Sequence, residues 1–199
     1  MPTVGGGERH YLLIVLDFAR TLSYTVKTAE RGGAALKSIE TERKYLIRMP
    51  SDELLSRCER SEIVQTYLRL PENGGARVRA RTGKNGCVYT KTAKKRITEI
   101  SRIELEDEID RETYLELLRF ADPDRRAVEK TRYVLSYEAQ SFEIDVYPFW
   151  KDRAIMELEL ETEDQRISFP PDISVIREVS TEKAYSNSSL AREIPDENI

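Results

Sequence analysis

The sequence predicts an α+β protein built on an eight-stranded antiparallel closed β-barrel with a charged interior and flanking helices. Between residues 39 and 161, short segments alternate between charged and apolar side chains, as strands with two different faces do. Acidic side chains that share one face of a strand (an acidic file) and basic side chains that share one face (a basic file) fall on separate strands. This indicates complementary walls around one space. With 199 residues, 39% hydrophobic and 34% charged, the chain has the size and composition of one well-charged domain with a core.

The chain divides into three parts. Residues 1–37 form an N-terminal extension, with a helix expected over about 8–30 and a break at Gly32-Gly33 before the first strand. Residues 38–191 form the barrel domain, and residues 192–199 form a C-terminal tail. The sequence assigns no chemistry to the extension, which is either an appendage or a cover for one end of the barrel.

The first half of the barrel begins with a strand over 39–47 that places Glu40, Glu42 and Lys44 on one face. Ser51 then has the side chain of an N-cap, and a short helix should follow it. Strands are expected over 63–70, 77–81 and 87–92, because residues alternate there and Asn85-Gly86 is a strong hairpin signal.

The second half repeats the pattern. A strand over 103–109 carries an acidic file, and the apolar spacing over 111–120 predicts a helix. Lys130 and Arg132 then share one strand face, and acidic files return in the strands over 141–147 and 156–161. For a single strand, exposure of one face to solvent would explain the charges. Across the whole set, separate acidic and basic files favour a charged interior.

Composition excludes several classes of function. The 32 basic and 36 acidic residues give a net charge of -4, which argues against a nucleic-acid binder. The two cysteines, Cys58 and Cys87, are too few for a disulfide framework. We therefore expect the protein to reside in the reducing cytoplasm. His10 is the single histidine, and no run is long enough to predict a membrane span.

The charged files suggest a particular chemistry. Clustered carboxylates without histidine or cysteine are hard oxygen ligands that suit Mg²⁺ or Mn²⁺. Files of arginine and lysine suit several phosphate groups. Together they predict metal-assisted phosphoryl transfer on a small-molecule polyphosphate.

These residues resemble those of a known family. Glu40-Thr41-Glu42-Arg43-Lys44 matches the ExExK signature of the CYTH superfamily, the triphosphate tunnel metalloenzymes. The resemblance covers roughly 38–191 and implies an eight-stranded tunnel, a cytoplasmic enzyme and dependence on a divalent metal. The signature is followed in order by Gln65-Thr66-Tyr67-Leu68, Arg77-Val78-Arg79, Glu104-Leu105-Glu106, Lys130-Thr131-Arg132-Tyr133, Phe142-Glu143-Ile144-Asp145 and Glu157-Leu158-Glu159, and the series closes with Tyr185-Ser186-Asn187.

The resemblance also implies roles for individual residues. The implied metal carboxylates are Glu40, Glu42, Asp145, Glu157 and Glu159. The implied substrate-binding residues are Lys44, Arg77, Arg79, Lys91, Lys130, Arg132 and Lys183. Lys44, Arg79 and Glu159 are the implied catalytic residues, and Glu104, Glu106 and Glu143 are implied supports that hold either a basic residue or a second metal ion.

We therefore expect a hydrolase of inorganic tripolyphosphate or a small organic triphosphate, acting through metal-activated water. The alternatives are a class IV type adenylate cyclase, a thiamine triphosphatase and a non-catalytic polyphosphate-binding module. Neither nucleic acid nor a membrane is an expected partner, and a homodimer is one assembly open to the chain.

Overall fold

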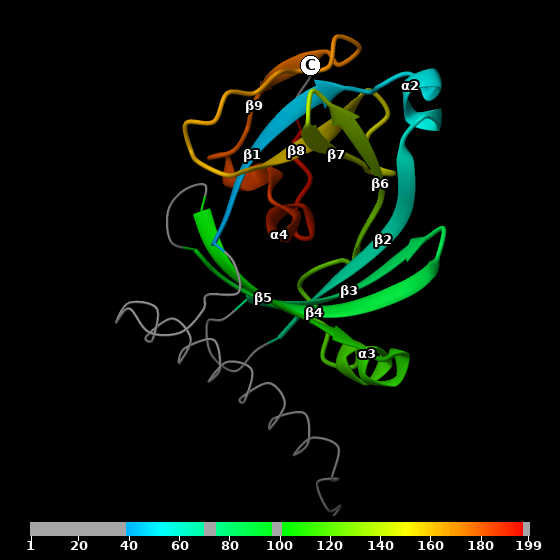
Figure 1. Cartoon of the computed structure of the whole chain (residues 1–199). Coiled ribbons are helices and arrows are strands. Elements are labelled where there is room, and N and C mark those ends of the chain that lie inside the picture. The colour runs from blue at the N-terminus through cyan, green and yellow to red at the C-terminus, as the bar shows by residue number, and fades with distance from the viewer. Residues whose placement is uncertain (1–38, 70–74, 97–100, 197–199) are drawn as a thin grey trace, which may run out of the picture.

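The computed structural model describes residues 39–69, 75–96 and 101–196 (Figure 1). The helix expected over 8–30 lies outside these residues. The described part contains the 3-10 helix η1 (Lys183–Tyr185) and three α-helices, α2 (Asp52–Ser56), α3 (Arg111–Leu118) and α4 (Asn187–Leu190). Its strands are β1 (Ile39–Arg48), β2 (Glu59–Leu68), β3 (Gly75–Gly83), β4 (Gly86–Arg96), β5 (Ser101–Ile109), β6 (Val128–Tyr137), β7 (Gln140–Val146), β8 (Arg153–Leu160) and β9 (Val175–Glu178).

The strands form one antiparallel sheet of nine strands in the order β5-β4-β3-β2-β6-β7-β8-β1-β9. The sheet curls strongly, so that β5 meets β1 over three residue pairs, Ile39↔Ile103 to Thr41↔Ser101. The prediction of a closed eight-stranded barrel is wrong. One edge of β1 pairs with β8, and β9 takes part of the other edge at Tyr45, Leu46 and Ile47. Because that stretch of β1 is already paired, no full ladder between β1 and β5 closes the sheet.

Most of the predicted elements lie where the sequence placed them. The Asn85-Gly86 signal produces the hairpin between β3 and β4, in which Gly83 pairs with Gly86. Gly86 has φ +116°, a value that side chains other than glycine rarely tolerate. Ser51 caps α2 by accepting a hydrogen bond from the Leu54 amide, and Asp110 caps α3 in the same way from Thr113.

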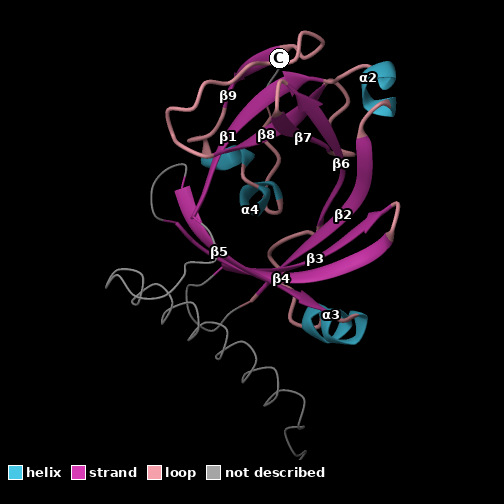
Figure 2. Cartoon of the chain, viewed as in Figure 1, coloured by secondary structure: helices cyan, strands magenta, loops and turns pink. Residues whose placement is uncertain are grey.

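The convex face of the sheet carries two apolar clusters, and the helices α2 and α3 lie on the outside of the sheet (Figure 2). Tyr114 and Leu117 of α3 pack on Val78, which is fully buried in β3. On the opposite side of the molecule, Leu54 of α2 and Ile173 belong to the cluster on the outer side of β1, β7 and β8. These contacts bury the apolar files, so the charged files are left on the concave face.

The concave face has a charged part and an apolar part. Along β1 it presents Glu42 and Lys44 and then Leu46, since alternate residues share a face. Leu46 is fully buried among aromatic and aliphatic side chains of the C-terminal segment, and α4 lies within the curl of the sheet (Figure 1). We call this apolar part the floor; its residues include Leu46, Tyr147, Trp150, Ile155, Tyr185 and Leu190.

None of the helices in the described ranges has both the length and the apolar character needed to cross a membrane.

Candidate active site

The strand register brings the charged residues of four neighbouring strands onto the concave face. Glu42 lies opposite Glu159 and Lys44 opposite Glu157 across the β1–β8 pair. Partners directly opposite in an antiparallel pair share a face, so the register extends this surface through β7 to β6. We call it the acid–base wall; its residues are Glu42, Lys44, Lys130, Arg132, Glu143, Asp145, Glu157 and Glu159.

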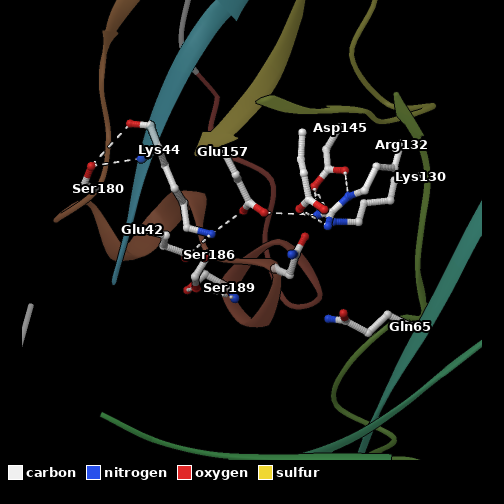
Figure 3. Close-up of polar contacts among 12 residues, drawn as sticks. Glu42, Lys44, Gln65, Lys130, Arg132, Asp145, Glu157, Ser180, Ser186 and Ser189 are labelled. Atoms are coloured by element: carbon white, nitrogen blue, oxygen red, sulfur yellow. Dashed lines mark hydrogen bonds and ion pairs between the residues drawn. The ribbon is translucent and has the colours of Figure 1, made fainter. Parts of the chain in front are cut away.

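Glu157 lies at the centre of the acid–base wall. The Lys44 ammonium group contacts Glu157 Oε1 and lies 2.8 Å from Glu42 Oε1. Arg132 Nη2 donates to Glu157 Oε2 from the other side, at 3.1 Å. Figure 3 shows Lys44 and Arg132 reaching Glu157 from opposite directions. One carboxylate therefore bridges two cations that come from different strands.

Asp145 is a second bridging carboxylate and is fully buried. Arg132 holds it with two parallel hydrogen bonds, Nε to Oδ1 and Nη2 to Oδ2, each 2.7 Å long. Lys130 also donates to Asp145, and Arg132 Nη1 donates to Glu143. Bidentate guanidinium–carboxylate pairs fix geometry as well as charge. The cations of this wall are thus held rigidly by carboxylates.

Burial and neighbouring charge shift the pKa values of this wall. Burial lowers the pKa of Lys130 to about 8, although Asp145 partly offsets that effect. Burial alone would raise the pKa of Glu157, but Lys44, Lys130 and Arg132 hold it well below its usual value. Glu157 is therefore ionised at neutral pH, and Lys130 loses its proton closer to neutrality than an ordinary lysine does.

The opposite side of the curl presents arginines held by different groups. Arg77 Nη1 donates to Gln65 Oε1 at 2.8 Å, and Arg79 Nη2 lies 2.8 Å from Glu106 Oε1. Thr92, which is fully buried, donates to the other oxygen of Glu106 at 2.8 Å. We call this surface the arginine wall; its residues are Gln65, Arg77, Arg79, Arg81, Thr92 and Glu106. Burial and the charges of Arg77, Arg132 and Arg81 lower the pKa of Arg79, although Glu106 acts against them.

The structure does not bring all of the predicted site residues to this face. Lys91 pairs with Val78 and Asp107, so its side chain leaves the sheet on the convex side, where its Nζ lies 3.6 Å from Asp107. Arg77 pairs instead with Thr92, one residue further along. Because side chains alternate along a strand, Lys91 cannot join the arginine wall without a register shift.

Four other predicted site residues either are exposed or have side chains outside the described part of the structure. Lys183 of η1 is exposed. Tyr185 of the same 3-10 helix, not Lys183, packs in the floor. Glu159 is exposed, although it lies opposite Glu42 on the concave face. The side chains of Glu40 and Glu104 lie outside the described part of the structure.

Sequence reasoning missed three polar residues that contact the site. Gln65 bridges Arg77 and Tyr67, and Thr92 holds Glu106. The available signal for Gln65 was its place in the sequence: it shares a strand face with Tyr67, and the next strand carries the file of arginines. Ser180 accepts a hydrogen bond from the Lys44 amide at 3.0 Å, a contact that no local pattern indicates because 136 residues separate the two.

Comparison with known proteins identifies the family. The family model of the CYTH domain matches residues 38–193. The chain belongs to the CYTH domain family. This CYTH protein is 35% identical over 159 residues to an inorganic triphosphatase of Nitrosomonas europaea, and the match covers 78% of this chain and 99% of that protein.

Two solved structures resemble this CYTH protein over most of its length. The crystal structure of an inorganic triphosphatase has a TM-score of 0.53 and 29% identity, and covers 81% of this chain and 100% of its own. A second crystal structure, of a protein described as hypothetical, has the same TM-score of 0.53 with 30% identity, and covers 78% of this chain and 99% of its own.

Enzymes of the CYTH family depend on a metal ion, and the donor set of the concave face fits one. Within the described ranges, no three His, Cys, Asp or Glu side chains converge on one point. Glu42 and Glu159 nevertheless lie directly opposite each other on neighbouring strands. Mg²⁺ commonly takes one or two protein carboxylates and completes its shell with water and substrate phosphates. Two facing carboxylates beside a row of cations suit that arrangement.

Proposed function

We propose that this CYTH protein hydrolyses inorganic tripolyphosphate in a reaction that requires Mg²⁺ or Mn²⁺. The observation that carries the proposal is the concave face itself, on which Lys44, Lys130 and Arg132 alternate with carboxylates and face Arg77 and Arg79 across the curl. Phosphate oxygens can take over the cations, and a divalent metal ion would offset the negative charge of the carboxylates so released. The inorganic triphosphatase that is 35% identical supports the same substrate.

The carboxylates and the cations of the concave face have different proposed roles. When bound, a divalent metal ion would offset phosphate charge and make water a better nucleophile, with Glu42, Glu157 and Glu159 as its candidate carboxylates and Asp145, which Arg132 and Lys130 hold, as a further one. Lys44, Arg79 and Arg132 would offset the charge on the bridging and leaving oxygens. In the reaction, a water oxygen bonds to the terminal phosphorus and the bond to the bridging oxygen breaks, releasing phosphate and pyrophosphate.

The floor favours a chain of phosphates over a nucleotide. The apolar groups gather at the buried end of the concave face, around Leu46 and Ile155, where Tyr185 and Leu190 already pack. The charged part thus offers many cations to a polyphosphate and little apolar surface to a base. Two free thiols, Cys58 and Cys87, are in keeping with a proposed cytoplasmic location.

A substrate panel tests the proposal. Purified protein with Mg²⁺ or Mn²⁺ should hydrolyse tripolyphosphate with a higher kcat/KM than ATP or thiamine triphosphate, and chelator should abolish turnover reversibly. Glu42→Gln and Glu159→Gln should abolish turnover while the circular dichroism spectrum stays unchanged. Cyclic AMP formed from ATP would identify a cyclase instead, and full activity in chelator would overturn the metal requirement.

A further inference from the structure

The segment that follows β9 holds both backbone polar groups of Lys44. The Val179 amide donates to the Lys44 carbonyl at 2.8 Å, and the Ser180 hydroxyl accepts from the Lys44 amide at 3.0 Å (Figure 3). In a regular antiparallel ladder, a single residue would make both bonds with its own N–H and C=O. The Val179 carbonyl instead accepts from the Glu182 amide at 3.0 Å, because the chain turns away from β1 towards η1. The side chain of Ser180 therefore takes the place of a ladder carbonyl.

The hydroxyl group of Ser180 is oriented for this contact. It lies 2.6 Å from Glu178 Oε1 and 3.5 Å from the Lys44 carbonyl oxygen. A carboxylate can only accept, so the hydroxyl proton points to Glu178 and an oxygen lone pair faces the Lys44 amide. Val179, the preceding residue, is 1% exposed and packs in the floor. The segment thus reaches Lys44 from a fixed position.

Lys44 lies where the outer edge of β1 changes its partner. That edge pairs with β5 over residues 39–41 and with β9 over residues 45–47. Within the described ranges, neither of these two ladders includes Lys44. The other edge of β1 pairs with β8, where Lys44 lies opposite Glu157. Ser180 and Val179 therefore fix the outer edge of β1 at the residue that carries a cation into the acid–base wall.

We propose that Ser180 is a positioning residue for Lys44: its hydroxyl group holds the backbone from which the Lys44 side chain reaches the substrate. The ammonium end of that side chain is held by Glu42 and Glu157. When a phosphate group takes the place of these carboxylates, the backbone end stays fixed and limits where the flexible lysine stem can place its charge. Small displacements of a charge-stabilising group have large effects on rate. This inference rests on the proposed function for the reaction in which Lys44 acts.

A double-mutant cycle on turnover tests this role. The kcat for tripolyphosphate with Mg²⁺ is measured for the parent, Ser180→Ala, Lys44→Met and the double variant. Ser180→Ala should lower kcat roughly 3-fold to 30-fold, less than the 10²-fold that a 1 Å misplacement can cost. In the Lys44→Met background, it should change kcat by less than about twofold, since the positioned group is already gone. Ser56→Ala is the matched control, because the Ser56 hydroxyl also bonds to the backbone, at the Glu53 carbonyl of α2, and belongs to neither wall.

Amide hydrogen exchange followed by NMR tests the contact itself, without substrate. Ser180→Ala should speed exchange of the Lys44 amide by about tenfold or more, because that amide loses its acceptor. The amide of Leu46, which pairs with Arg177 of β9, should exchange as in the parent. Ser180→Thr keeps a hydroxyl group and should restore both the exchange rate and kcat to within about threefold of the parent values.

The outcomes separate this inference from the proposed function. Parent-like kcat in Ser180→Ala, or an equal loss in the parent and Lys44→Met backgrounds, would overturn the positioning role even if the parent hydrolyses tripolyphosphate. If Lys44→Met has no measurable turnover, the exchange data decide: faster exchange at Lys44 alone, reversed by Ser180→Thr, supports the role, and equal acceleration at Leu46 overturns it. A parent that does not hydrolyse tripolyphosphate overturns the proposed function, whereas selective protection of the Lys44 amide would still support the hold by Ser180.

Discussion

The acid–base wall and the arginine wall face each other, yet they hold their cations in opposite ways. In the acid–base wall, Arg132 contacts three carboxylates and is almost fully buried. In the arginine wall, Arg77 is held by an amide and Arg79 by one partly exposed carboxylate. A cation matched by several buried carboxylates contributes order, whereas a cation paired with one partly exposed carboxylate can exchange that partner for a ligand. We therefore expect mutation of Arg132 in the first wall to affect stability as well as turnover, and mutation of Arg79 in the second wall to affect mainly turnover.

The largest expected effect is on the stability of the acid–base wall. Arg132→Met should lower the free energy of unfolding by about 3 to 5 kcal/mol, because it leaves the buried Asp145 and Glu157 with fewer partners. Arg79→Met, on the other wall, should lower it by no more than about 1 kcal/mol, as for a partly exposed pair. Urea denaturation at pH 7 measures both. Equal losses would show that the two walls do not differ.

In the arginine wall, mutation should affect turnover much more than stability. Arg79→Ala should lower kcat by roughly 10² to 10³, by analogy with the loss of other preorganised charge-stabilising donors, and it should leave the unfolding midpoint nearly unchanged. Arg57→Ala is the control, because Arg57 is exposed, belongs to neither wall and lies 3.5 Å from Asp172. If Arg79→Ala turns over tripolyphosphate like the parent, the arginine wall does not bind the substrate.

The pH dependence of binding should identify Lys130. Its pKa is lowered to about 8 by burial, so it is charged at pH 7 and loses its proton as the pH rises through 8, while ordinary lysines remain charged. Binding of tripolyphosphate should weaken over that range by several-fold in the parent. Lys130→Arg keeps its charge and should show a flatter profile of dissociation constant against pH. Identical profiles would exclude Lys130 as the group responsible.

The smallest expected effect concerns the two faces of one strand. Lys91→Ala should change kcat/KM for tripolyphosphate by less than about twofold, because Lys91 points to the convex face and pairs with Asp107 in a partly exposed contact. The assay and conditions are those used for Arg79→Ala. A loss comparable to that of Arg79→Ala would mean that β4 pairs in a different register.

Local patterns predicted most of the elements and much of the concave face. Alternation identified the strands that carry Arg77, Lys130 and Asp145, because period-two burial is a property of the strand itself. The capping side chain of Ser51 and the Asn85-Gly86 turn are equally local signals. The metal set, including Glu42 and Glu159, stays a prediction that the chelator and substitution experiments can decide.

The errors occurred where the answer depends on distant partners. β9 was missed because its four residues, Val175 to Glu178, show no alternation, and they become a strand only by pairing with β1. That pairing is also why the closed barrel is wrong. Lys91 was misplaced because its face depends on register, and a shift of one residue reverses the face of every side chain in a strand.

The sequence by itself determined where the charged files are, which signs they carry and which chemistry they favour, since each of these follows from residue type and local periodicity. Only the tertiary structure decided which cation meets which carboxylate, that the Gln65 amide accepts a hydrogen bond from Arg77, and that the C-terminal segment forms an apolar floor. The physical reason is that ion pairs and packing depend on distances between strands far apart in the chain, and these distances follow from register and curvature, which no local pattern encodes.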